Sequence, residues 1–77
     1  MNQNRSQEMA VKQTALLRKV MGNNNIKNYA ALSRAIGVST PALSKYVNGD
    51  LPIGDSMILR LHETFGVPVA TIRAALV

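Results

Sequence analysis

Residues 29–48, with the sequence YAALSRAIGVSTPALSKYVN, decide the fold of this chain. Apolar side chains recur at Leu32 and Ile36, and again from Leu43 onward, at the spacing of one helix face. Between these two segments lies the tripeptide Gly-Val-Ser at residues 37–39. The glycine permits a positive φ, the valine can fill the inside of the corner, and the serine can cap the next helix. The stretch therefore predicts two short helices held at a fixed angle by a tight turn.

Two helices joined in this way form a helix-turn-helix, whose second helix lies in the major groove of DNA. The second helix is expected over about residues 40–47, with Pro41 in its first turn, where a missing N–H has no cost. Its inward positions are apolar, whereas its outward positions are small, polar or basic. Such a face can reach base edges and phosphates.

The rest of the chain shows the same helical periodicity. The first helix of the pair is expected over about residues 28–36. Apolar spacing and stop signals predict three further helices, over about residues 8–21 and 54–65 and from Pro68 to Leu76. No stretch alternates with a period of two, so the predicted fold class is all-α, a compact domain of five helices. Residues 1–7 are polar and are expected to form a flexible N-terminal arm, with a single domain over residues 8–77.

Composition excludes several classes of function. The chain has 77 residues, no cysteine, one histidine and four acidic residues, which is a poor inventory for a metal site or an active site. We expect no enzyme activity, no cofactor, no metal and no small-molecule ligand. No apolar run reaches the roughly 20 residues of a membrane span, and no secretory signal is visible, so a soluble cytoplasmic protein without membrane association is expected. The start at Met1 suggests a complete regulator without an attached sensor module.

Charge points to a polyanionic partner. The formal net charge is +5, and the basic excess is confined to the first two-thirds of the chain, because residues 50–77 contain two basic and three acidic residues. A basic protein of this size often binds nucleic acid, although a generic basic surface is an equally common reading of charge alone.

The sequence resembles the lambda repressor and Cro-type (Xre-like) helix-turn-helix family over about residues 9–76. The resemblance is carried by Leu32, the run Ile36-Gly37-Val38-Ser39, Leu43-Ser44, Tyr46, Asn48-Gly49 and the later segment Leu61 to Val69. It implies a five-helix DNA-binding domain that acts as a homodimer on a palindromic operator of double-stranded DNA.

The resemblance also assigns site residues by position. The expected base-contacting residues are Ser39, Thr40, Pro41, Ser44 and Lys45. The expected phosphate-contacting residues are Lys27, Asn28, Tyr29, Arg34 and Asn48. For each there is a plainer reading as a cap, a core residue, a surface ion pair or a solvated side chain; for Lys45, Thr40 and Ser44 the place in the motif favours DNA contact.

The sequence departs from the family pattern at three places. Ser33 stands where alanine is usual, so its hydroxyl must fit between the helices or bond the preceding turn. Tyr29 replaces a glutamine, and Pro41 replaces a residue that often reads bases by hydrogen bond. The outward face of the helix at about residues 40–47, which we call the recognition face, has no Arg or Gln. Specificity is therefore expected to depend on Lys45, on hydroxyl contacts and on DNA shape.

The last helix has two readings. Its apolar face either completes the core or forms a dimer interface. The interface is favoured because a protein that binds a palindromic operator is expected to do so as a dimer. The residues expected there are Val69, Ile72, Arg73 and Leu76. His62 is expected to be a packing or interface residue, and Arg5 either an arm that follows a DNA groove or part of a disordered end.

These observations predict a small regulator of transcription from a phage, prophage or plasmid. As a dimer it would occupy an operator and repress transcription, with an affinity that falls steeply with salt. Three alternatives share the fold: an autoregulating antitoxin, a CII-like activator, and a protein-interaction module that has lost DNA binding.

Overall fold

The computed structural model describes the backbone of residues 2–77 and the side chains of residues 7–77. Five α-helices make up the fold, in the order α1 (Asn2–Asn23), α2 (Tyr29–Ile36), α3 (Thr40–Val47), α4 (Asp55–Phe65) and α5 (Val69–Leu76). No strand occurs within residues 2–77. The expected all-α domain of five helices is confirmed.

The helix boundaries follow from local chemistry. The side chain of Asn28 accepts a hydrogen bond of 2.8 Å from the N–H of Ala31 and so caps the start of α2. Gly37 and Gly66 end α2 and α4 in the left-handed conformation, with φ of 70° and 72°. Both glycines occupy a conformation that an L side chain adopts only at a cost, which explains the choice of residue.

The start of α1 differs from the expected one. The helix begins at Asn2, whereas the apolar periodicity begins only near Glu8. Periodicity reports which residues pack, and a helix that is already nucleated can extend into a polar segment at little cost. The expected start of this helix near Glu8 is therefore corrected to Asn2. The division into an arm and a domain at residue 8 remains a prediction.

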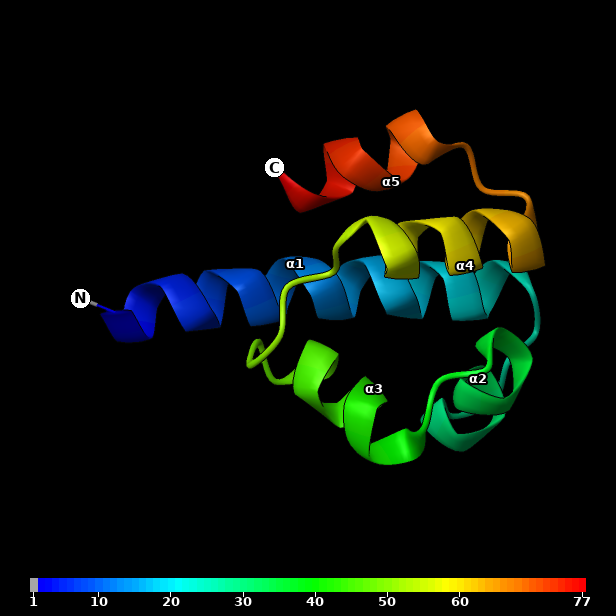
Figure 1. Cartoon of the computed structure of the whole chain (residues 1–77), viewed down its shortest axis with the longest axis horizontal. Coiled ribbons are helices and arrows are strands. Elements are labelled where there is room, and N and C mark those ends of the chain that lie inside the picture. Colours follow the sequence, from blue (N-terminus) through cyan, green and yellow to red (C-terminus); the bar gives the residue numbers. More distant parts are fainter. Residues whose placement is uncertain (1) are drawn as a thin grey trace.

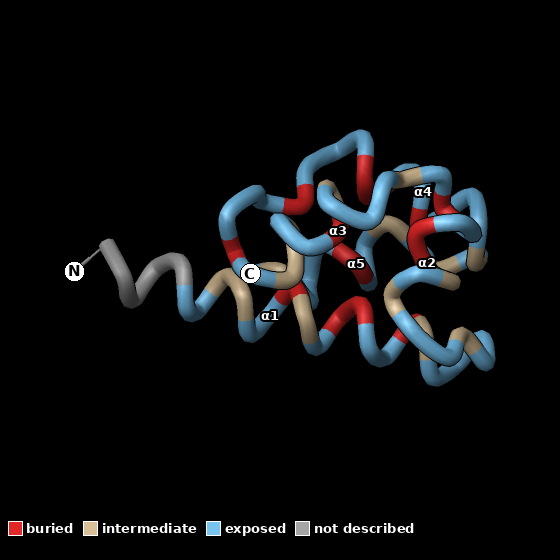
Figure 2. The backbone as a smooth tube through the Cα atoms, turned by 90° about the horizontal axis from the view of Figure 1, so that it is seen from below, coloured by how far each residue is buried: buried red, intermediate tan, exposed pale blue. Residues whose placement is uncertain are grey.

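Helix α1 organises the packing. It contacts α3 on one side and α5 on another, while α4 contacts both α2 and α5 (Figure 1). All five helices contribute buried residues to one core cluster, and these positions alternate with exposed ones along the chain (Figure 2). The largest fully buried side chains are Leu17, Leu32, Leu43, Met57, Leu61 and Ile72. Truncating one of them to alanine typically costs about 2–5 kcal/mol.

Helix α5 is part of this core, which corrects one expectation. Ile72 is completely buried inside its own chain, so its side chain does not meet a second copy as the sequence analysis expected. Val69 and Leu76 are half-buried against the same core. An amphipathic stripe shows that a helix face is covered but not by which chain, and here the cover is the monomer's own interior.

Candidate nucleic-acid interface

The turn between α2 and α3 is closed by backbone hydrogen bonds that converge on one carbonyl. The oxygen of Ser33 accepts from the N–H of Gly37 and, at 3.0 Å, from the N–H of Val38. The side chain of Val38 is half-buried against the core. Ser39 then has extended backbone angles, and its hydroxyl accepts from the N–H of Ala42 at 3.2 Å. Each residue of the Gly-Val-Ser turn thus plays the part that the sequence predicted for it.

The structure shows how the hydroxyl of Ser33 is accommodated at a position where the family usually has alanine. Ser33 is buried, and its hydroxyl donates to the carbonyl of Ala30 at 2.9 Å, one turn back in the same helix. The hydroxyl of Thr40 lies 3.5 Å from that of Ser33. The serine therefore fits between the helices by bonding its own helix, and it places a polar atom beside the first residue of α3.

Arg60 of α4 stabilises the turn from outside it. Its Nη1 atom donates to the carbonyl of Ile36 at 2.9 Å and to that of Gly37 at 3.3 Å. These carbonyls are at the C-terminal end of α2, where the helix dipole favours a cation. The contact is close: a Cβ atom added at Gly37 would lie 3.2 Å from Nη1. No motif indicated Arg60, because its partners lie 23 and 24 residues away in the chain.

The other end of α3 is held by α1. The amide nitrogen of Gln13 donates to the carbonyls of Tyr46 at 2.6 Å and Leu51 at 2.9 Å. Its amide oxygen accepts from the N–H of Ile53 at 2.6 Å. Gln13 is 2% exposed, so these bonds form in the interior, where an unmade bond would be costly. Thr14 adds a bond to the carbonyl of Val47 at 3.1 Å. Sequence reasoning missed both residues, since a polar residue on a helix does not reveal a distant partner.

The outer face of α3 remains exposed to solvent when both ends of the helix are bound in this way. The five expected base-contacting residues, Ser39, Thr40, Pro41, Ser44 and Lys45, are all exposed. Positions 40, 41, 44 and 45 share one helix face, because they are separated by one turn. Ser39 and Thr40 differ from Ser44 and Lys45 in that their hydroxyls already have partners within the chain, the N–H of Ala42 for Ser39 and the hydroxyl of Ser33 for Thr40. Ser44 and Lys45 are thus the freest polar side chains of this face.

The expected phosphate-contacting residues surround the same unit. Lys27, Asn28, Arg34 and Asn48 are exposed, whereas Tyr29 is half-buried and packs against the core. The oxygen of the Asn28 side chain is used for the cap of α2, which leaves its NH₂ group outward as a donor. The N-termini of α2 and α3 add the partial positive charge of their dipoles. The arrangement can bind a polyanion through charge, N–H donors and hydroxyls.

Arg73 and His62 take local partners. Arg73 forms an ion pair of 3.3 Å with Asp55, and both side chains are largely exposed. His62 lies 2.8 Å from the carbonyl of Val67 through its Nδ1 atom, which ties the end of α4 to the following loop. Within the described part of the chain, no three His, Asp or Glu side chains are grouped as metal ligands. No helix in residues 2–77 is long and apolar enough to cross a membrane.

A comparison with protein families agrees with this geometry. The family model described as helix-turn-helix matches residues 17–72, which includes α2 and α3 and most of the core. No curated protein and no solved structure matches the chain.

Proposed function

This chain belongs to the lambda repressor and Cro-type (Xre-like) helix-turn-helix family of DNA-binding domains, and on that premise we propose that it regulates transcription by binding a specific operator. Helix α3 enters the major groove, and Ser44 and Lys45 contact base edges. Ser39, Thr40 and Pro41 lie at the leading end of the helix. Pro41 offers only apolar contact, which suits a thymine methyl group.

The observation that carries this proposal is the exposed outer face of α3 on a helix fixed at both ends. Ser39 caps its N-terminus, and Gln13 and Thr14 bind the carbonyls at its C-terminus. A helix that reads bases must hold its side chains within a fraction of an ångström of the productive position. The hydrogen bonds that fix both ends of this short helix are consistent with such a role.

Phosphate contacts supply most of the affinity in the proposed complex. Lys27 and Arg34 provide charge, and Asn28, Tyr29 and Asn48 provide hydrogen-bond donors near the ends of α2 and α3. These contacts fix the position of the domain on the duplex without reading sequence. Because they release counterions, the affinity should fall steeply as salt rises.

The regulator acts as a homodimer on a palindromic operator in this proposal, and it represses by excluding polymerase. The exposed positions of α5 form the dimer contact, with Arg73 and the outer edges of Val69 and Leu76 at its surface. A two-fold dimer presents two α3 helices about one DNA turn apart, roughly 34–36 Å. We further propose an origin on a phage, prophage or plasmid; an antitoxin or a CII-like activator would use the same DNA contacts.

A protein-interaction module that has lost DNA binding is the competing proposal. It is favoured by the recognition face itself, which has no Arg or Gln and therefore lacks the strongest bidentate base readers. The exposed Lys45 and the positive charge near α2 and α3 argue against it.

A gel shift separates the two. The full chain is titrated into labelled DNA from the regions flanking its own gene, at low and at moderate salt. A discrete complex that survives excess unrelated DNA supports the regulator. Binding that any competitor removes equally, or no binding even at low salt, would favour the interaction module.

A further inference from the structure

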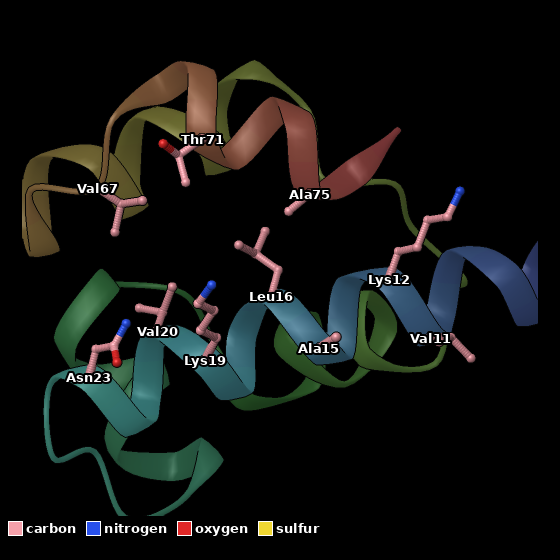
Figure 3. A pocket seen from close by; sticks show the side chains of 10 residues that line it. All are labelled: Val11, Lys12, Ala15, Leu16, Lys19, Val20, Asn23, Val67, Thr71 and Ala75. Carbon is pink, nitrogen blue, oxygen red and sulfur yellow. The ribbon is translucent and has the colours of Figure 1, made fainter.

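A second surface lies on α1, away from the helix-turn-helix. It is a groove of about 340 Å³ between α1 and α5 (Figure 3). Leu16 and Val20 of α1 point toward Val67, Thr71 and Ala75 on the other side, whereas Val11, at the edge of the lining, points away from α5 (Figure 3). Val11, at one end of the groove, is 68% exposed. We name this surface the α1–α5 groove.

The shape of the groove suits an elongated ligand. Along α1 it extends from Val11 to Asn23, which spans about 18 Å at a rise of 1.5 Å per residue. A second, shallower hollow over Ala10, Val11, Thr14 and Ala15 lies around α1 on the side of Thr14, which bonds α3, and does not lengthen the groove. A helix of about three turns matches this length, and its apolar face could fill the groove as other amphipathic helices fill theirs.

The charge of the groove selects the kind of helix. Among residues 7–77, whose side chains the structure describes, Lys12 and Lys19 are the only charged residues that line it, and both are exposed. They are seven residues apart, so they lie on the same side of α1 at a separation of two turns. No acidic residue of this described range lines the groove. We propose that the α1–α5 groove binds an acidic amphipathic helix of a partner protein, with carboxylates two turns apart that pair with Lys12 and Lys19.

Two other occupants fit the observations less well. A two-fold contact between copies of this chain would bring the groove against itself and place four lysines in one interface without an acid among the lining residues. DNA has the charge but no apolar face for Val11 and Ala15. The groove is also on the α5 side of α1, whereas α3 packs on another side (Figure 1), so a duplex held by α3 does not reach it.

The groove can act alongside the proposed DNA-binding dimer. Thr71 and Ala75 lie two residues along α5 from Val69 and Arg73, which corresponds to a rotation of about 200° around the helix. The groove and the proposed dimer contact therefore use nearly opposite faces of α5. The inference goes beyond the proposed function and does not depend on it, because it uses neither α3 nor the dimer.

Binding of a designed peptide to the full chain tests the proposal. The probe is a fluorescent helical peptide of about four turns, with leucines along one face and two glutamates seven positions apart at its edge. The matched control peptide has lysines in place of these glutamates. We expect the acidic peptide to bind at least about tenfold more tightly than the control at low salt, with a difference that shrinks as salt rises.

Variants of the chain locate the site. The double substitution Lys12→Gln and Lys19→Gln should weaken the acidic peptide about fivefold or more, and Thr71→Trp, which changes no charge, should abolish its binding by filling the groove. Lys45→Ala, a matched change on the DNA face, should leave peptide binding unchanged. Equal binding of both peptides, no binding of either, or a loss caused by Lys45→Ala and not by the groove variants would overturn the proposal. So would a groove-dependent dimer in sedimentation, which would make a second copy the occupant.

Discussion

Replacing Gln13 by methionine should destabilise the whole domain, although the side chain keeps its size and its place on α1. The substitution removes three hydrogen bonds that join α1 to the end of α3 and to the α3–α4 loop. The three backbone groups that lose their hydrogen bonds to Gln13 differ in whether another partner can replace it. The carbonyl of Tyr46 keeps a bond of 3.3 Å from the N–H of Gly49, and Leu51 is 39% exposed, so its carbonyl can be hydrated. The N–H of Ile53 is buried and loses its acceptor.

The magnitude follows from these three losses. An unsatisfied buried donor costs about 1–3 kcal/mol, and each of the other two bonds contributes about 0.5–1.5 kcal/mol before water replaces part of it. We therefore expect Gln13→Met to lower the free energy of unfolding by about 2–4 kcal/mol. For a domain of this size each kcal/mol corresponds to roughly 4–8 °C in Tm, which predicts a fall of about 8–32 °C.

Thermal unfolding followed by circular dichroism measures this effect. The matched control is Gln7→Met, the same change at an exposed position of the same helix, for which no shift is expected. If Gln13→Met and Gln7→Met unfold within about 2 °C of each other, the interior bonds of Gln13 contribute nothing, and the argument that α1 fixes the end of α3 is wrong.

Three further predictions concern the turn and the DNA face. Gly37→Ala should lower the free energy of unfolding, measured with denaturant, by about 1–2 kcal/mol, because alanine is disfavoured at a φ of 70°. The control Gly22→Ala, in open space within α1, should be neutral or should raise the free energy of unfolding by about 0.5–1 kcal/mol. Arg60→Met should lower the free energy of unfolding by about 1 kcal/mol and weaken operator binding, whereas the exposed Arg18→Met should not change stability. In a salt titration of operator binding, the two cations expected to contact phosphate in each protomer, Lys27 and Arg34, predict a slope of about −4 for log K against log salt in the dimer; a flat line would contradict the phosphate contacts.

The local part of the fold could be predicted from sequence because its determinants are local. Asn28 and Ser39 cap the helices that follow them by accepting from the N–H three residues ahead, and Gly37 sets the turn through its own backbone angles. Such residues act within a few positions in the chain, so their order in the sequence carries the information. The inward positions of α2 and α3 followed in the same way from their spacing.

The supports of the site could not be predicted, because their partners are distant. Arg60 and Gln13 act on carbonyls and an N–H that lie 23 to 40 residues away, and no spacing within α1 or α4 distinguishes them from surface residues. For Ile72 the spacing of apolar residues predicted a covered position but not what covers it. Its apolar stripe was visible, but whether the chain itself or a second copy covers it depends on how α5 packs on α1.

Binding of the Lys45→Ala and Lys12→Ala variants to the operator tests most directly whether the outer face of α3 reads DNA. Both variants remove one exposed lysine, and so they change the net charge equally, but only Lys45 lies on α3. We predict that Lys45→Ala weakens specific binding about tenfold or more, as the loss of one base contact implies, and that Lys12→Ala weakens it much less. Equal losses in the two variants, or no loss in Lys45→Ala, would show that α3 does not present the recognition face.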